Sequence, residues 1–179
     1  MFQGNGFAIC YLEFLEILLK MKIKIDDIVD QLEVSLDTGN SYLNKLTGEL
    51  YYISDEIFGY LDGAEEEDTL EDLPDWESDL VKVAKEINET NNYVQLPGKF
   101  ELNEYRMMEK FCLSITDERL RDEMYYSIKG SGAFRRFKDN IHRHGIEKDW
   151  FAFKSSELCA IAIDWCQSNN LEFDDRKNL

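Results

Sequence analysis

Apolar residues recur every three or four positions from Leu102 onward, which is the period of helices with one buried face. This pattern predicts four helices, at residues 104–114, 117–129, 132–144 and 147–168. Thr116 and Ser131 are the expected N-caps of the second and third helices, and Gly145 is the expected end of the third. The second half of the chain is therefore predicted to be mostly helical.

The apolar faces of the last two of these helices bear on the candidate site. The third helix is expected to bury a stripe formed by Phe134, Phe137 and Ile141. The last is expected to bury a longer stripe formed by Phe151, Leu158, Ile161, Ala162 and Trp165. Trp150 and Phe153 follow the third helix closely, and we interpret them as core or groove-wall residues rather than a stacking platform.

The first half of the chain mixes strands and helices. Residues 41–44 and 49–54 flank a Lys-Leu-Thr-Gly turn, and tyrosines favour strands on both sides of it. Gly48 supplies the positive φ that such a turn needs. Two strands alone are marginal in water, so we expect a third from 21–25 or 93–96. The predicted fold class is α+β, with a small antiparallel sheet built on a hairpin at about 41–54.

Two further helices are predicted around this hairpin. The first runs to Glu33, with Asp26 or Asp27 as its cap. Its buried side is expected to hold Ile25, Ile28, Val29 and Leu32. The second spans 74–89, with Pro74 in its first turn. Its buried side is expected to hold Trp76, Leu80, Val83, Ala84 and Ile87.

A chain of 179 residues suits a single domain. We expect residues 1–20 to be an N-terminal extension and 21–179 to be one domain, with an acidic part at 21–90 and a helical part at 91–179. The apolar run at 7–19 is too short to span a bilayer and lacks the basic lead-in of a signal peptide. It must be buried on the body or against a second copy, so a homodimer and no membrane association are predicted.

The net charge of −17 is concentrated in one stretch. Residues 25–90 carry twenty Asp and Glu against three Lys, and the densest part, 62–72, is predicted to be an exposed loop. The simplest interpretation of this acidity is that it keeps the protein soluble. The alternatives are a surface at 55–79 that docks a basic protein partner, or a decoy that imitates nucleic acid.

Cysteine and histidine usage predicts neither disulfides nor a metal site. The four cysteines form no CxxC pair and are expected to be core residues of a cytoplasmic protein; they are Cys10, Cys112, Cys159 and Cys166. The histidines, His142 and His144, are two apart and fall on different faces of a helix. We expect no cofactor.

The candidate site is a basic island at residues 129–143, which holds five Lys and Arg against one Asp. Gly130, Ser131 and Gly132 precede a helix whose first N–H groups lack helical partners. These donors, together with the side chains that follow, could hold an anion. The candidate residues are Ser131, Gly132, Arg135, Arg136 and Lys138, with His142 and Arg143 as secondary candidates.

Alternatives remain for this island. Its cations could pair with the acidic stretch at 25–90, or they could form a solvated face. A Walker-type phosphate loop is excluded because no GxxxxGK[ST] sequence occurs. Exposed aromatics beside Arg136 and Arg143 would favour binding of single-stranded nucleic acid.

From residue 21 to 173 the chain resembles a bacterial protein family known only as uncharacterised. The resemblance rests on the segments MKIKIDDIVDQLE, YLNKLTGELYYIS, YVQLPGKFELNEYRMMEKF, GSGAFRRFKDNIHRHG, DWFAFK and AIAIDWC. The motif GxGAFRRFKD is its expected signature. The resemblance implies a cytosolic bacterial domain and brings no activity, cofactor or catalytic residue.

The sequence therefore favours a binding or interaction module with an anion-accepting helix N-terminus. A phosphate-ester or nucleotide-handling enzyme that uses the same basic pocket, with acids from 55–72, is the first alternative. The acidic decoy is the second. No catalytic residue is assigned.

Overall fold

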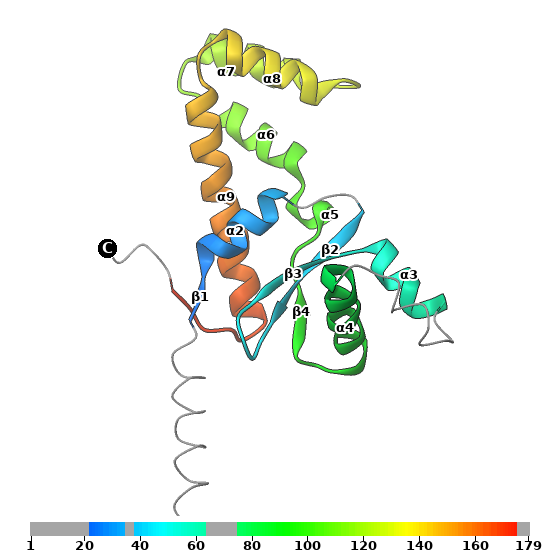
Figure 1. Cartoon of the computed structure of the whole chain (residues 1–179). Helices are drawn as coiled ribbons and strands as arrows, with labels where there is room; N and C mark the ends of the chain where they lie inside the picture. The colour runs from blue at the N-terminus through cyan, green and yellow to red at the C-terminus, as the bar shows by residue number, and fades with distance from the viewer. Residues whose placement is uncertain (1–21, 35–37, 64–74, 175–179) are drawn as a thin grey trace, which may run out of the picture. The chain divides into compact units, whose positions relative to one another are not determined.

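The computed structural model describes residues 22–34, 38–63 and 75–174, which Figure 1 draws as helices, strands and coloured loops. The chain folds into two compact units. Unit 1 contains the described residues up to 98 and those from 163 onward, and unit 2 contains residues 99–162. Residues 1–20, most of the predicted acidic loop at 62–72, and Pro74 lie outside the described residues. The apolar run at 7–19 also lies outside the described residues, so the structure does not test the homodimer that was predicted from it.

Unit 1 is built on a three-stranded antiparallel sheet. Its strands are β2 (Gly39–Asn44), β3 (Leu50–Ser54) and β4 (Tyr93–Gln95), in the order β3-β2-β4. The hairpin is confirmed, with Gly48 at φ 74° in its turn. The third strand comes from one of the two predicted segments, since β4 pairs with the hairpin through β2.

Two helices cover this sheet with a shared apolar core. They are α3 (Asp55–Gly63), which was not predicted, and α4 (Asp75–Glu89), which was. The core residues are Ile53, Ile57, Val81 and Ala84. Trp76 was expected on the buried side of α4 but is 62% exposed. It lies in the first turn, and the core contacts of the helix begin only at Leu80.

The ends of unit 1 pair with each other. Strand β1 (Ile23–Lys24) runs parallel to β5 (Phe173–Asp174) in a separate two-stranded sheet, so the segment 21–25 does not extend the hairpin as the alternative proposed. Helix α2 (Ile25–Val34) follows at once. It begins before Asp26 and Asp27, which therefore lie in its first turn rather than capping it. Its predicted apolar side is confirmed as buried.

Tyr51 makes the pH dependence of unit 1 testable. Its hydroxyl donates to Glu49 Oε2 at 2.7 Å, and this bond is the main reason why the pKa of Tyr51 is raised to about 12 and the pKa of Glu49 is lowered. The tyrosine contribution is complete below the ordinary pKa of 10.0 and is lost as pH rises to about 12. The carboxylate contribution is complete above 4.5 and is lost as pH falls below that value.

We expect Tyr51→Phe to flatten the pH dependence of the melting temperature at both ends. The variant and the wild type should be compared from pH 3 to 11, with Tyr52→Phe as the control, because Tyr52 bonds to Thr38 rather than to a carboxylate. Identical pH profiles for Tyr51→Phe and the wild type would contradict this assignment.

Unit 2 is helical, as predicted. It contains α5 (Lys99–Leu102), α6 (Glu104–Ser114), α7 (Glu118–Ser127), α8 (Ala133–Arg143) and the larger part of α9 (Glu147–Ser168). Asp117, rather than Thr116, caps α7 and accepts from the Leu120 N–H at 2.8 Å. The ion pairs Lys110–Glu157 and Lys154–Glu104 join α6 to α9.

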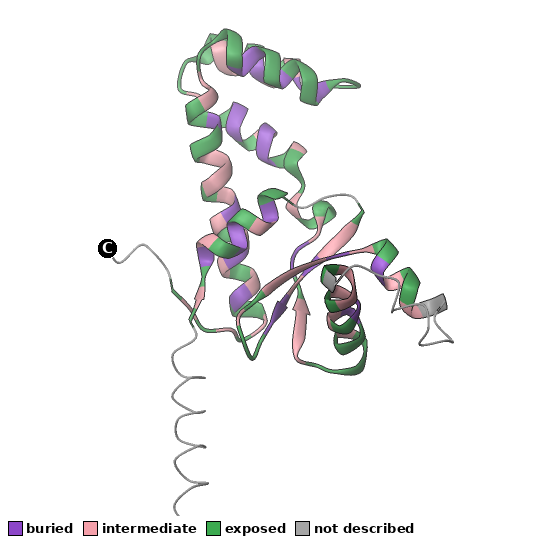
Figure 2. Cartoon of the chain, viewed as in Figure 1, coloured by how far each residue is buried: buried purple, intermediate pink, exposed green. Residues whose placement is uncertain are grey.

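Aromatic rings form the centre of this unit. Phe137 is 1% exposed and meets the rings of Trp150 and Phe111 edge to face, with centroids 4.7 and 6.0 Å away. Phe153 packs against Phe111, so the interpretation of Trp150 and Phe153 as packing residues is confirmed. In Figure 2 the buried positions form a narrow interrupted stripe along α8, and the rest of the helix is exposed.

Two predicted core residues of unit 2 lie at the surface instead. Phe134 is 47% exposed because the buried side of α8 is centred on Ala133, Phe137, Asn140 and Ile141. Phe151 is 63% exposed because Trp150, one position earlier, is the residue that α9 buries. In both helices the face that the structure buries is rotated from the face predicted by the spacing of the large apolar residues.

None of the helices in the described residues is both long and apolar enough to cross a bilayer.

Candidate functional site

The link between α7 and α8 is organised around the side chain of Arg136. Its guanidinium donates to the carbonyl oxygens of Ser127 at 2.7 Å (Nε), Lys129 at 2.7 Å (Nη2) and Ser131 at 2.5 Å (Nη1). The Gly130 oxygen lies 3.5 Å from Nη2. A single planar group thus joins the last residue of α7 to the segment that enters α8. Arg136 holds the backbone in place and has few donors left for a ligand.

The glycines of the link explain why the chain can adopt this path. Gly130 and Gly132 have φ of 79° and 77°, in the left-handed region that glycine tolerates best. Gly132 is the N-cap of α8, and no side chain caps this helix, so the prediction that Ser131 caps it is wrong. The physical reason is that the Ser131 carbonyl is turned toward Arg136 and the helix begins two residues later.

Backbone donors lie on the other side of these peptides. None of the described peptide bonds is cis, so in each bond the N–H points away from the carbonyl that precedes it. The N–H groups of Gly130 and Gly132 therefore point away from the Arg136 guanidinium. Neither has an acceptor among the described residues. Together they present donors to the outside of the link.

Arg135 and Lys138 are the unpaired cations of the basic island. Both are exposed on α8, and within the described residues neither forms a hydrogen bond or an ion pair. Their spacing of three places them on the same face of the helix, one turn apart. Phe134 precedes Arg135 and is the neighbour of Lys138 at a spacing of four.

The other cations of the island have partners. Lys129 donates to Glu109 at 2.9 Å and lies 3.8 Å above the ring of Tyr125. Hydrogen bonds with Tyr125 and Glu109 raise the pKa of Lys129, and the bond from Lys129 lowers the pKa of Glu109. Arg143 Nη1 lies 3.9 Å from Glu123 Oε1. These partners come from α6 and α7, whereas the pairing alternative had named acids at 25–90.

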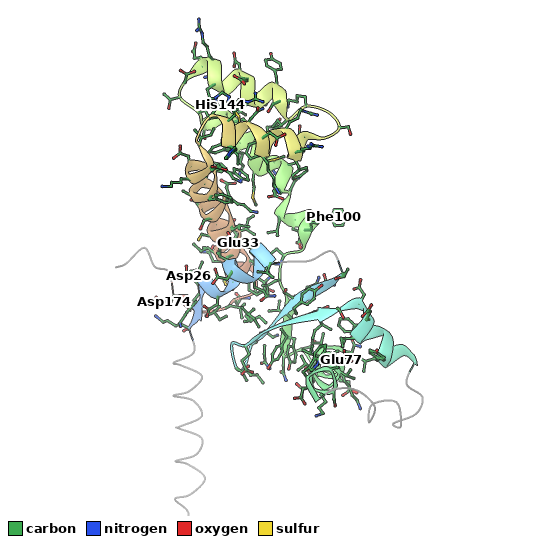
Figure 3. All side chains as sticks on the ribbon, turned by 45° about the horizontal axis from the view of Figure 1, so that its top comes forward. Asp26, Glu33, Glu77, Phe100, His144 and Asp174 are labelled. Atoms are coloured by element: carbon green, nitrogen blue, oxygen red, sulfur yellow. The ribbon has the colours of Figure 1, made fainter. Side chains whose placement is uncertain are left out.

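The secondary candidates lie at the end of α8. His142 Nδ1 is 3.0 Å from Glu147 Oε1. His144, which is labelled in Figure 3, has its Nε2 3.1 Å from the Glu123 carboxylate that Arg143 also approaches. Gly145, at φ 67°, ends the helix as predicted, with its N–H bonded to the His142 carbonyl. The secondary candidates therefore both lie beside carboxylates of unit 2, His142 beside Glu147 and Arg143 beside Glu123.

The sequence pattern did not predict two exposed aromatic residues that lie near the link between α7 and α8. Tyr126, in the last turn of α7, is 73% exposed, and Phe134, in the first turn of α8, is 47% exposed. They flank the link that Arg136 holds. The signal that could have found Phe134 is its position four residues before Lys138, on the polar side of the helix.

The described part of the chain contains no candidate metal site, and two of its cysteine thiols are buried. No group of three or more His, Cys, Asp and Glu residues there could hold a metal ion. Cys112 and Cys166 are fully buried, and burial raises the pKa of each thiol to about 11. This confirms both as core residues. Cys159 is partly buried, and Cys10 lies outside the described residues.

The model of one protein family matches residues 19–179. The chain belongs to the uncharacterised protein family UPF0158. The match to UPF0158 includes all the described residues, and it confirms the resemblance at the level of the family. That GxGAFRRFKD is the signature of UPF0158 stays a prediction. No curated protein and no solved structure matches the chain significantly.

Proposed function

We propose that this protein is a binding module that accepts an anionic group on the exposed face of α8. The observation that carries the proposal is the difference between neighbouring cations. Arg136 is occupied by the carbonyls of the link, and Lys129 and Arg143 have carboxylate partners. Arg135 and Lys138 are exposed and unpaired within the described residues.

The local charge supports an anionic ligand despite the overall acidity. Residues 99–162 hold twelve Lys and Arg against eleven Asp and Glu, a net charge of +1, whereas the whole chain carries −17. An anion that approaches α8 therefore meets a nearly neutral unit and, on this helix, two exposed cations that form no ion pair within the described residues. Coulomb interactions between exposed charges fall off within about 8–10 Å at physiological ionic strength, so the local charge has the larger effect.

The chemistry of the face suits oxyanions. An arginine guanidinium can hold two oxygens of a phosphate or carboxylate at once, and a lysine ammonium adds a point charge one turn away. The outward N–H groups of Gly130 and Gly132 can donate to a further oxygen. The acids that the enzyme alternative drew from 55–72 lie mostly outside the described residues.

Thermal unfolding tests this proposal. We expect tripolyphosphate, nucleotides or sugar phosphates at about 100 times the dissociation constant to stabilise the wild type by about 2.7 kcal/mol, which is roughly 5–10 °C for this size. Arg135→Ala/Lys138→Ala should lose this shift and keep its own melting temperature, because neither side chain forms a hydrogen bond or an ion pair within the described residues.

Arg119→Ala/Lys148→Ala is the matched control. Both residues are exposed, belong to unit 2 and lack partners within the described residues, so the variant has the same net charge without changing α8. It should keep the ligand shift. If both variants lose the ligand-induced shift equally, the shift comes from net charge and not from α8. If none of these anions shifts the melting temperature of the wild type, the proposal is contradicted.

We also propose that the protein works in the bacterial cytoplasm. The support is the state of its cysteines: Cys112 and Cys166 are buried, unpaired thiols whose raised pKa keeps them protonated. Such residues persist most easily in a reducing compartment.

A further inference from the structure

We infer that the anion accepted at α8 belongs to single-stranded nucleic acid, which binds by stacking a base on Phe134 while its phosphates contact Arg135 and Lys138. The inference rests on the proposed function and names the ligand class of the same face. Its independent observation is the exposure of Phe134, a large apolar ring that the hydrophobic pattern assigns to the core and the structure leaves 47% exposed.

The position of Phe134 relative to the cations fits one nucleotide step. Arg135 and Lys138 are neighbours on one helix face at a spacing of three, with Cβ atoms about 5–6 Å apart, and Phe134 lies one turn from Lys138 on the same exposed side. Successive phosphates of a nucleic-acid strand are separated by a similar order of distance. A base that covers the ring therefore has phosphates within reach of both cations.

The rigidity of the face favours a stacking role. Phe137, three residues after Phe134, is anchored between Trp150 and Phe111, and this fixes the phase of α8. Arg136 fixes the start of the helix by its bonds to the link. Phe134 thus remains exposed because its neighbours on both sides of the helix are held, and little conformational entropy is lost when a base covers it.

A second ring extends the surface along the chain. Tyr126 is 73% exposed at the end of α7, and Arg136 ties the Ser127 carbonyl, next to Tyr126, to the start of α8. The two exposed rings therefore flank one clamped link. Each offers a π-face that accepts any base, so we expect little sequence preference.

Single strands fit this surface better than the competing polyanions. A duplex keeps its bases stacked internally, so the Phe134 ring gains nothing from it. Polyphosphate and acidic peptides satisfy Arg135 and Lys138 but have no aromatic face for Phe134. Stacking therefore predicts a preference for single strands over anions of equal charge.

Fluorescence anisotropy with the full chain tests the inference. The probes are labelled 12-nucleotide single strands of RNA and of DNA, a 12-base-pair duplex, polyphosphate of matched charge and poly-glutamate of matched charge. We expect single strands to bind at least tenfold more tightly than the other polyanions. Phe134→Ala should weaken single-strand binding about 5- to 150-fold and leave polyphosphate binding unchanged, and Phe134→Trp should restore it.

Two controls separate stacking from general effects. Phe151→Ala removes another exposed phenylalanine of unit 2, on α9, and should have no effect. Arg135→Ala/Lys138→Ala should reduce the slope of log affinity against log salt by about 1.4, the value for two phosphate contacts on a single strand. Arg119→Ala/Lys148→Ala should leave that slope unchanged.

The outcomes distinguish this inference from the proposed function. One outcome is that Arg135→Ala/Lys138→Ala loses polyphosphate binding while Phe134→Ala binds single strands as tightly as the wild type does. This result would overturn the nucleic-acid assignment but would still support an anion site on α8. Poly-glutamate that binds as tightly as RNA and depends on Phe134 would overturn it in favour of an acidic protein partner. No binding of any polyanion would overturn both.

Discussion

Replacing Phe137 by alanine is expected to lower the free energy of unfolding by about 3–5 kcal/mol. Phe137 is 1% exposed, and its ring packs edge to face against Trp150 and Phe111. The substitution removes this apolar area from the core and leaves a cavity that the two neighbouring aromatic rings cannot easily fill. Urea denaturation followed by tryptophan fluorescence measures the loss, because Trp150 is in direct contact with the deleted ring.

Phe134 provides a matched control on the same helix. It is the same residue type three positions earlier, but it is 47% exposed. Phe134→Ala should change the free energy of unfolding by about 0.5 kcal/mol or less. If the two alanine variants lose equal stability, the phase of α8 is wrong, and the binding face proposed on it is wrong as well.

Replacing Arg136 by alanine is expected to cost about 1–2 kcal/mol of stability. The guanidinium donates to the carbonyls of Ser127, Lys129 and Ser131, and water replaces only part of that network because the guanidinium also fixes the geometry of the link. Arg136→Lys should recover less than half of the loss, since a single ammonium cannot reproduce a planar fork of donors.

Arg135 is the control for this second experiment. Arg135→Ala removes the same charge from the adjacent position, but it removes no hydrogen bond or ion pair within the described residues. Its stability should stay within about 0.5 kcal/mol of the wild type. Urea unfolding of the three variants side by side checks the assignment, and an Arg135→Ala variant as unstable as Arg136→Ala would refute it.

Most of the fold could be predicted from periodicity and turn chemistry. The hairpin, its third strand and the helices of unit 2 each have a local signal, such as Gly48 in the turn or Gly145 after α8. Helix α3 could not be predicted, because its sequence, DEIFGYLDG, leads directly into an acidic run and contains a glycine. Its stability comes from packing against α4 and the sheet, which local sequence does not record.

The basic island at 129–143 could be selected from the sequence as a candidate site, but the roles of its residues could not be assigned from the sequence. Arg135 and Arg136 are adjacent and identical in type, and only the path of the link decides which one turns back to the backbone. Ser131 has the right residue type for a cap, yet Gly132 takes that position because a left-handed residue lets the chain turn sharply. Such choices depend on tertiary geometry rather than on spacing.

The account assigns ligand binding to Arg135 and the holding of the backbone link to Arg136. The most direct test of these two roles is nuclear magnetic resonance of the arginine side chains. In ¹⁵N-labelled protein titrated with tripolyphosphate, we predict that the Nε–H signal of Arg135 shifts with the ligand. The Nε–H of Arg136, which donates to the Ser127 carbonyl, should exchange slowly with solvent in the free protein and stay nearly unchanged. A ligand-induced shift at Arg136 without one at Arg135 would contradict the account.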